Sequence, residues 1–272
     1  MLIQDARGSI DCAEAGSGTT LVFVPGSFAT PAAWRGVIAG LQGKYRIVTT
    51  SLLGYGATAE RRTAADTSLA HELDVLAAVA QKAGGPLHLV AHSYGGLCSL
   101  ALALSGRVPL ASMTLFEPNP IDVLWQIGDS ALMSDVRALM DAYFADHAAG
   151  EPLAARRIID FYGGAGAFDA MPERARQYVV ATTAANVLDW KSAAAWVLPL
   201  DTYSELNIPT AIVCGANTHP AVRRIDTVLA GVMPRTTLDV IDGASHFLIT
   251  THPAECAARI ESHVAGVLAG GA

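Results

Sequence analysis

The chain has 272 residues, of which 51% are hydrophobic and 16% are charged. This balance excludes an extended disordered region and fits one large α/β domain with a sizeable core. A net charge of −7, with no basic run longer than an arginine pair, argues against nucleic acid and anionic membrane as partners.

Targeting and cofactor signals are also missing from the sequence. The first residues have no apolar segment typical of a signal peptide, and the longest apolar run, 97–104, is too short to span a bilayer. The cysteines show no CxxC spacing and the histidines no HExxH spacing. We therefore expect a cytoplasmic protein without membrane insertion, disulfides, metal or other cofactor, which acts on a small molecule; its oligomeric state is unknown.

Short apolar or β-branched runs recur along the chain and alternate with helical patterns. Runs of this kind suit strands that are buried on both faces of a parallel sheet. The expected strands are 9–15, 21–24, 46–50, 87–91, 112–116, 210–214 and 237–241, and the expected helices are 69–83, 95–104, 222–229 and 253–268. The alternation predicts an α/β fold with a mostly parallel central sheet flanked by helices.

One segment, 118–207, interrupts this alternation because it shows helical stretches and no convincing strand. The clearest helices are 135–147 and 172–183, and the segment contains three of the four tryptophans, Trp125, Trp190 and Trp196. We expect a helical lid inserted into a core made of residues 1–117 and 208–272.

The strongest chemical signal is the sequence His92-Ser93-Tyr94-Gly95-Gly96, which follows the expected strand 87–91 and opens an apolar helix. A serine on a sharp strand-to-helix turn exposes its hydroxyl group, and the residues two before and two after it must be small. Ala91 and Gly95 meet this requirement. The pattern predicts that Ser93 is a nucleophile.

A serine nucleophile needs a base, and His246 is the best placed histidine. It follows the last expected strand, 237–241, so it lies at the carboxyl edge of the sheet, as Ser93 does. His88 lies within a strand and His147 within the expected lid, so neither is well placed.

An oxyanion site is expected from two backbone N–H groups. The Tyr94 N–H follows the nucleophile, and the Ser27 N–H lies in the turn after strand 21–24, next to Gly26. The expected pocket residues are three aromatic residues: Phe28 next to Ser27, Phe247 next to His246, and Trp125 in the expected lid. Many further apolar residues in the segment 118–207 favour a hydrophobic pocket.

Four motifs together resemble the α/β-hydrolase superfamily, and more narrowly a lidded serine hydrolase. They are Pro25-Gly26, Leu53-Gly54-Tyr55-Gly56, the motif around Ser93, and Gly243-Ala244-Ser245-His246, in the family's order. The resemblance covers nearly the whole chain apart from the expected lid. It implies an α/β-hydrolase fold and a Ser-His-acid triad.

The resemblance also implies an acid, usually Asp, in the loop after strand 210–214. Thr218 stands at the expected position, and no carboxylate follows before Asp226. Some relatives, including certain haloalkane dehalogenases, take their acid from the end of the strand that here is 112–116. Glu117 follows that strand directly and is our candidate for the acid.

Two other residues remain alternatives for orienting His246: Asn217, which would do so without charge, and Asp122 inside the expected lid. The nucleophile is a serine, which argues against dehalogenase or epoxide hydrolase chemistry, because both need a carboxylate nucleophile in this fold. The resemblance therefore implies an esterase-type hydrolase that acts on a small, largely apolar carbonyl substrate through an acyl-enzyme.

Two alternative functions stay open, one a different enzyme activity and the other binding without catalysis. A lactonase or a carbon–carbon bond hydrolase would use the same Ser93 and His246, and only a substrate screen would separate it from an esterase. A non-catalytic ligand-binding protein on the same scaffold is favoured only by the missing acid near Thr218.

Overall fold

A computed structural model describes residues 2–270, which form an eight-stranded sheet in the order β1-β2-β4-β3-β5-β6-β7-β8. The strands are β1 (Leu2–Asp5), β2 (Gly8–Ala15), β3 (Thr20–Val24), β4 (Arg46–Thr50), β5 (Leu87–His92), β6 (Leu110–Phe116), β7 (Thr210–Gly215) and β8 (Thr236–Ile241). Strands β1 and β2 pair antiparallel, and β3 to β8 run parallel. The predicted fold class, a mostly parallel sheet flanked by helices, is confirmed.

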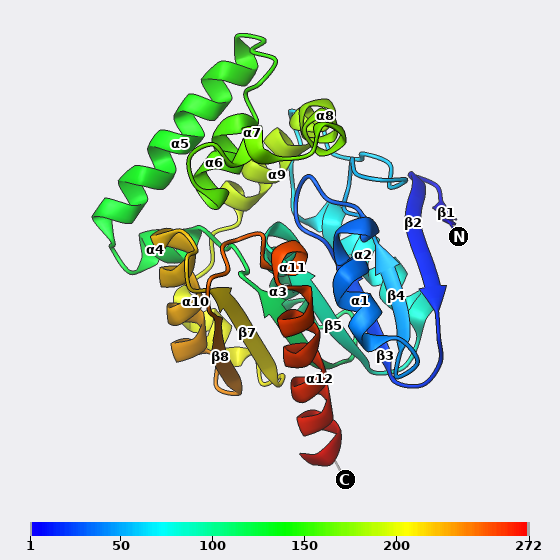
Figure 1. Ribbon diagram of the computed structural model, residues 1–272. Coiled ribbons are helices and arrows are strands. Elements are labelled where there is room, and N and C mark those ends of the chain that lie inside the picture. Colours follow the sequence, from blue (N-terminus) through cyan, green and yellow to red (C-terminus); the bar gives the residue numbers. More distant parts are fainter. Residues whose placement is uncertain (1, 271–272) are drawn as a thin grey trace.

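Helices cover both faces of this sheet (Figure 1). One face carries α1 (Arg35–Leu41) and α12 (Pro253–Gly270), together with the short η1 (Pro31–Trp34) and α11 (Leu248–Thr251). The other face carries α2 (Ala70–Ala83), α3 (Tyr94–Leu104) and α10 (Pro220–Val232). The sheet is therefore the middle layer of three.

The place of strand β3 in the middle layer explains why every residue from Leu21 to Val24 is apolar. Leu21 and Phe23 belong to the hydrophobic cluster on the α1 and α12 face, whereas Val22 and Val24 belong to the cluster on the α2 and α3 face. Successive side chains of a strand point to opposite faces, so a strand covered on both sides needs apolar residues at every position.

Between β6 and β7 the chain forms a set of helices that we call the inserted helices. They are α4 (Asp122–Gln126), α5 (Ser130–Ala148), α6 (Arg156–Gly163), α7 (Ala167–Ala170), α8 (Glu173–Ala181) and α9 (Thr183–Ala195), followed by η2 (Leu200–Glu205). In Figure 1 they gather at one end of the sheet. The division into a core and a lid stays a prediction.

Sequence patterns missed several elements, among them β1, α1 and α9. Strand β1 has polar residues at Gln4 and Asp5 and is held by backbone pairing with β2. Helix α1 is short and contains two glycines, and α9 continues the chain directly after α8, so the predicted helix 172–183 covers only part of this pair.

Within residues 2–270, no helix combines the length and apolarity needed to cross a bilayer.

Helix α12 offers a matched pair of apolar residues that tests the packing on its face of the sheet. Ile260 is fully buried, whereas Leu268 is 51% exposed. We expect Ile260→Ala to lower the free energy of unfolding by about 2–5 kcal/mol, because it removes packed methyl groups and leaves a cavity. Leu268→Ala should change it by less than about 0.5 kcal/mol. Urea denaturation measures both, and equal losses would contradict the packing described for α12.

Candidate active site

Ser93 lies on the turn between β5 and α3, with φ of 53° and ψ of −125°. This conformation is strained for a residue with a side chain, and it lifts the hydroxyl group away from both elements. The turn is also crowded. A Cβ atom on Gly95 would lie 2.2 Å from the carbonyl oxygen of Pro25, so only glycine fits there.

Positive φ angles at residues with side chains are concentrated at this site. Within the described part of the chain they occur at Phe28 (58°), Ser93 (53°) and Glu117 (50°), which follow β3, β5 and β6. Each such residue costs on the order of 1–3 kcal/mol and persists only where its surroundings hold it. The carboxyl ends of three neighbouring strands therefore share one strained, closely packed region.

His246 lies in the loop between β8 and α11 and is in hydrogen-bond contact with both other predicted catalytic residues. Its Nε2 atom is 2.9 Å from the Ser93 Oγ, and its Nδ1 atom is 2.5 Å from the Glu117 Oε2. Because an ionised carboxylate only accepts hydrogen bonds, Nδ1 carries the ring proton and donates it to Glu117. Nε2 is then free to accept the proton of the Ser93 hydroxyl.

Glu117 is fully buried and accepts two further hydrogen bonds. The Gly215 N–H donates to Oε1 and the Thr218 hydroxyl donates to Oε2, both at 2.7 Å. Burial raises the pKa of Glu117, but the hydrogen bond and charge of His246, with these two donors, outweigh burial and hold the pKa below its ordinary value. The carboxylate is therefore ionised beside the imidazole ring.

Thr218 stands where the acid was expected from the resemblance, and its hydroxyl binds the carboxylate that comes from the end of β6. The two alternatives for orienting His246 have other partners. Asn217 donates to the carbonyl oxygen of Gly243, and Asp122 accepts from the N–H of Leu198.

His92 supports the loop that carries His246. Burial lowers the pKa of His92 to about 3, and the nearby His246 contributes a smaller part of this shift. The His92 ring is therefore neutral. Its Nε2–H donates to the carbonyl oxygen of His246 at 2.8 Å. The residue before the nucleophile thus holds the backbone of the histidine that contacts the nucleophile.

The N–H groups of Ser27 and Tyr94, predicted as oxyanion donors, have no hydrogen-bond acceptor among residues 2–270. Their loops touch, because a Cβ on Gly26 would lie 2.9 Å from the Ser93 Cβ. The oxyanion site stays a prediction, which needs two unpaired backbone donors of this kind.

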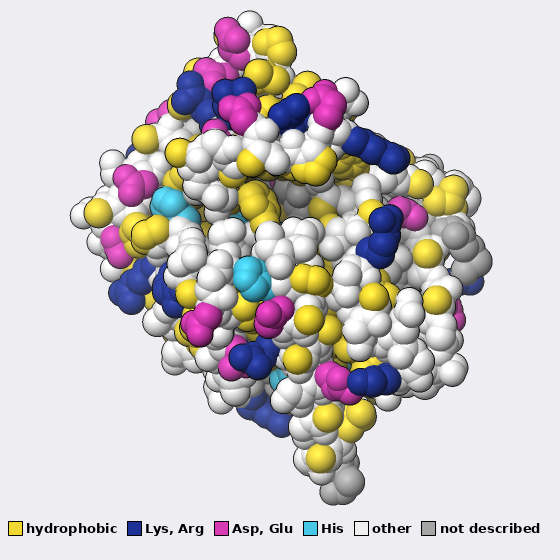
Figure 2. Space-filling model, in the orientation of Figure 1, with side chains coloured by type: hydrophobic (Ala, Val, Ile, Leu, Met, Phe, Trp, Pro, Cys, Tyr) yellow, Lys and Arg dark blue, Asp and Glu magenta, His cyan; other side chains and the backbone are white. Residues whose placement is uncertain are grey.

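Ser93 and His246 line a cavity of about 1300 Å³ between the sheet and the inserted helices. Figure 2 shows this hollow bordered by hydrophobic side chains. Phe28 and Phe247, two of the predicted pocket residues, line it. Trp125 does not line it, because α4 lies beside α5 and α10, where Trp125 packs against the hydrophobic core.

Several further pocket residues come from segment 118–207. Tyr162 and Trp190 belong to the apolar residues that predicted a hydrophobic pocket there, whereas Asn119 and Asp189 had no signal in the sequence. Tyr162 of α6 stacks on the His246 ring, with ring centroids 4.4 Å apart and an interplanar angle of 24°. Asn119 donates to the Tyr162 hydroxyl, and Trp190 and Asp189 of α9 also line the cavity. In the part of the chain described here, no group of three or more His, Cys, Asp or Glu is arranged to hold a metal ion.

Comparisons with known proteins agree with this fold. The model of the alpha/beta hydrolase family matches residues 21–259. A search of curated proteins found no match.

Solved structures share the fold at low sequence identity. A thermophilic esterase from Thermogutta terrifontis has a TM-score of 0.76 at 19% identity, covering 98% of this chain and 99% of that one. MenH from S. aureus has a TM-score of 0.76 at 16% identity, covering 95% and 98%. An epoxide hydrolase from Vigna radiata has a TM-score of 0.71 at 17% identity, covering 98% and 97%.

The contacts of Glu117 predict unequal effects of two substitutions on the reactivity of Ser93. Glu117→Gln should slow phosphonylation of Ser93 by a fluorophosphonate on the order of 10³–10⁴-fold, because an amide favours the wrong tautomer of His246. Thr218→Val should slow it less than about tenfold, because the Gly215 N–H and His246 still hold the carboxylate. Labelling reactions quenched at successive times give both rates, and thermal unfolding checks that both variants fold. Similar, small effects would exclude Glu117 as the orienting acid.

Proposed function

Because this chain belongs to the α/β-hydrolase family, we propose that it is a serine hydrolase that cleaves an ester or related acyl bond. The observation that carries the proposal is the continuous hydrogen-bond chain from Glu117 through His246 to Ser93 at the wall of a large cavity. In this fold such a chain activates a serine hydroxyl for attack on a carbonyl carbon.

In the proposed reaction the Ser93 Oγ attacks the substrate carbonyl carbon while His246 Nε2 takes the hydroxyl proton. His246 then gives this proton to the leaving group, and an acyl-enzyme remains on Ser93. Water, activated by His246, releases the acid. Glu117 stays ionised throughout, keeps the ring in the required tautomer and stabilises its positive charge.

The negative charge that develops on the carbonyl oxygen would be bound by the N–H groups of Ser27 and Tyr94. Both are backbone groups without a competing acceptor, and the Tyr94 N–H lies at the first turn of α3, where the helix dipole favours negative charge. A donor of this kind contributes about 2.7–4 kcal/mol to transition-state stabilisation.

The lining of the cavity supports a largely apolar substrate. Ile121, Ile158, Met171 and Val179 are among the residues that surround it, and residues 118–207 supply more than half of the lining. This supports residues 118–207 acting as a lid that shapes the pocket over Ser93. The volume is above the usual range of about 300–1,000 Å³ for small-ligand sites, so a bulky acyl or alcohol group would fit.

The alternatives are weighed by the same contacts. A non-catalytic binding protein was favoured by the missing acid near Thr218, and the hydrogen bond of Glu117 to His246 weighs against it. A lactonase or a carbon–carbon bond hydrolase would use the same residues. A panel of p-nitrophenyl esters of rising chain length, a γ-lactone and a vinylogous diketone separates these three enzyme activities.

The activation of Ser93 can be measured without knowing the substrate. We expect a fluorophosphonate probe to modify the wild-type protein at Ser93, as located by peptide mass spectrometry, because His246 withdraws the hydroxyl proton. Ser93→Ala should abolish labelling, and His246→Ala should lower its rate at least about 10³-fold.

His252→Ala is the matched control, because His252 is a partly buried histidine in the same region whose ring bonds Thr251 and none of Ser93, His246 and Glu117. It should label at the wild-type rate. A folded wild-type protein that neither labels nor hydrolyses any ester of the panel would exclude the proposed function and favour ligand binding without turnover.

A further inference from the structure

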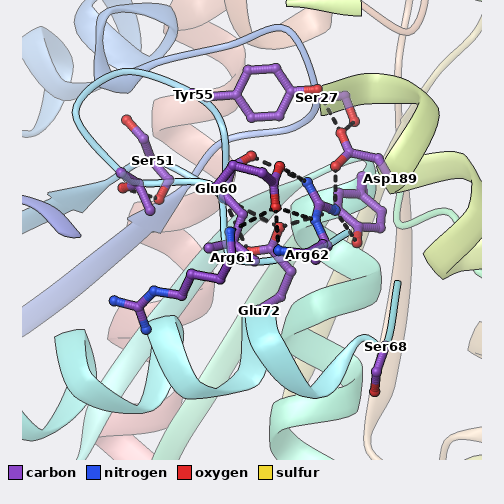
Figure 3. A network of polar contacts seen from close by, with 12 residues as sticks. Ser27, Ser51, Tyr55, Glu60, Arg61, Arg62, Ser68, Glu72 and Asp189 are labelled. Atoms are coloured by element: carbon purple, nitrogen blue, oxygen red, sulfur yellow. Dashed lines mark hydrogen bonds and ion pairs between the residues drawn. The ribbon is translucent and has the colours of Figure 1, made fainter. Parts of the chain in front are cut away.

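A second network of buried polar groups joins the predicted oxyanion loop to the inserted helices (Figure 3). At its centre is Asp189 of α9, which is 1% exposed and lines the cavity. The Ser27 hydroxyl and the Tyr55 hydroxyl both donate to its Oδ2 at 2.6 Å. Arg62 donates to its Oδ1 at 2.7 Å. Both oxygens are therefore occupied by groups of the protein.

Arg62 belongs to the loop between β4 and α2, and its side chain is fully buried. Glu60 accepts from its Nε and from one of its terminal nitrogens, at 2.9 and 2.8 Å. The carbonyl oxygen of Leu53 accepts a further hydrogen bond at 3.3 Å. The guanidinium group is thus fixed to the core independently of α9, and it provides a rigid partner for Asp189.

Both predicted oxyanion donors belong to residues whose side chains bind this ion pair. Ser27 binds Asp189 through its hydroxyl, and the Tyr94 hydroxyl accepts from Arg62 at 3.4 Å. The residue after Ser27, Phe28, has a positive φ of 58°, so this loop is strained and needs an external hold. A hydrogen bond to a buried, fully bonded carboxylate supplies one.

The negative charge of Asp189 is compensated, so it does not oppose a negative substrate oxygen that develops nearby. A lone carboxylate there would repel the negative oxygen, but Arg62 compensates Asp189 at hydrogen-bond distance. Burial raises the pKa of nearby Glu72 to about 8, so this third carboxyl group is mostly neutral at pH 7. The buried Arg62 and Asp189 then compensate each other one to one, and the second partner of Arg62, Glu60, has a side chain that is 28% exposed to solvent.

The backbone also lets α9 approach this loop closely. Gly54 has φ of 75°, and a Cβ atom there would lie 2.7 Å from the Cβ of Ala185 at the start of α9. Helix α9 is therefore in direct contact with the segment that holds Arg62, and any displacement of α9 would pull Asp189 away from both Arg62 and Ser27.

We propose that the buried Arg62–Asp189 pair is a positioning device that couples the seating of α9 to the geometry of the oxyanion site. Asp189 orients the Ser27 N–H through the Ser27 side chain, and Arg62 holds Asp189 and contacts Tyr94. The oxyanion site is then complete only when α9 lies on the core. This inference rests on the proposed serine hydrolase function, because it assigns the two N–H groups to a substrate oxygen.

The test compares nearly isosteric variants with p-nitrophenyl butyrate as substrate and phenylboronic acid as an analogue of the tetrahedral intermediate. Asp189→Asn should lower kcat about 10- to 100-fold with KM within about threefold, because the defect acts in the transition state. The inhibition constant of phenylboronic acid should rise by a similar factor. Ser27→Ala should behave alike, and Ser27→Thr, which keeps the hydroxyl group, should recover most of the loss.

Arg224→Gln is the matched control, because it breaks another contact between a core arginine and an aspartate of the inserted helices. Arg224 of α10 lies 3.8 Å from Asp129, the N-cap of α5, at an exposed place away from the pocket. It should leave kcat and the inhibition constant at wild-type values.

Three results would overturn the inference while the proposed function stands. The first is a folded Asp189→Asn variant with wild-type kcat and wild-type boronic acid affinity, while Ser93 still labels. The second is a loss confined to KM, and the third is a loss that Arg224→Gln reproduces. Either of these last two indicates general attachment of the inserted helices. A wild-type protein without labelling or hydrolysis would instead overturn the proposed function and this inference together.

Discussion

The buried carboxylate of Glu117 is the constraint around which the site is arranged. A charge removed from water needs compensating donors, and these come from the end of β7, from Thr218 after it and from His246 after β8. Such convergence requires β6, β7 and β8 to lie side by side with their carboxyl ends at one edge, as the sheet order provides. The orientation of the His246 ring toward Ser93 is a consequence of that arrangement.

Asp189 follows the same physical rule with a different partner. Glu117 is compensated by an imidazole and neutral donors, which hold its pKa below the ordinary value. Asp189 is compensated by the guanidinium group of Arg62, but burial still raises its pKa. In both cases each carboxylate oxygen has at least one donor from the protein, whereas the N–H groups of Ser27 and Tyr94 have no acceptor within residues 2–270. Under the proposed function, a substrate oxygen would accept hydrogen bonds from these two N–H groups.

Most of the sheet could be predicted because its signals are local. A run such as 21–24 is apolar at every position since β3 is covered on both faces, and the turn residues that end it are close in sequence. Strand β1 escaped detection because backbone pairing with β2 forms it, without an apolar pattern. The predicted helix 172–183 ended close to the boundary between α8 and α9, but α9 itself was not predicted.

The same difference between local and long-range signals separates the site residues that the sequence predicted from those that it did not. Ser93 and His246 could be identified because each lies in a short motif beside a predicted strand, and the elbow at Ser93 depends on residues within two positions of it. Glu117 needed the strand order as well, since its distance to His246 spans 129 positions of the chain. No sequence pattern pointed to the bond of Thr218 to Glu117 or to the pairing of Arg62 with Asp189. Those contacts join segments that only the packing of loops and inserted helices brings together, and burial then makes each of them obligatory.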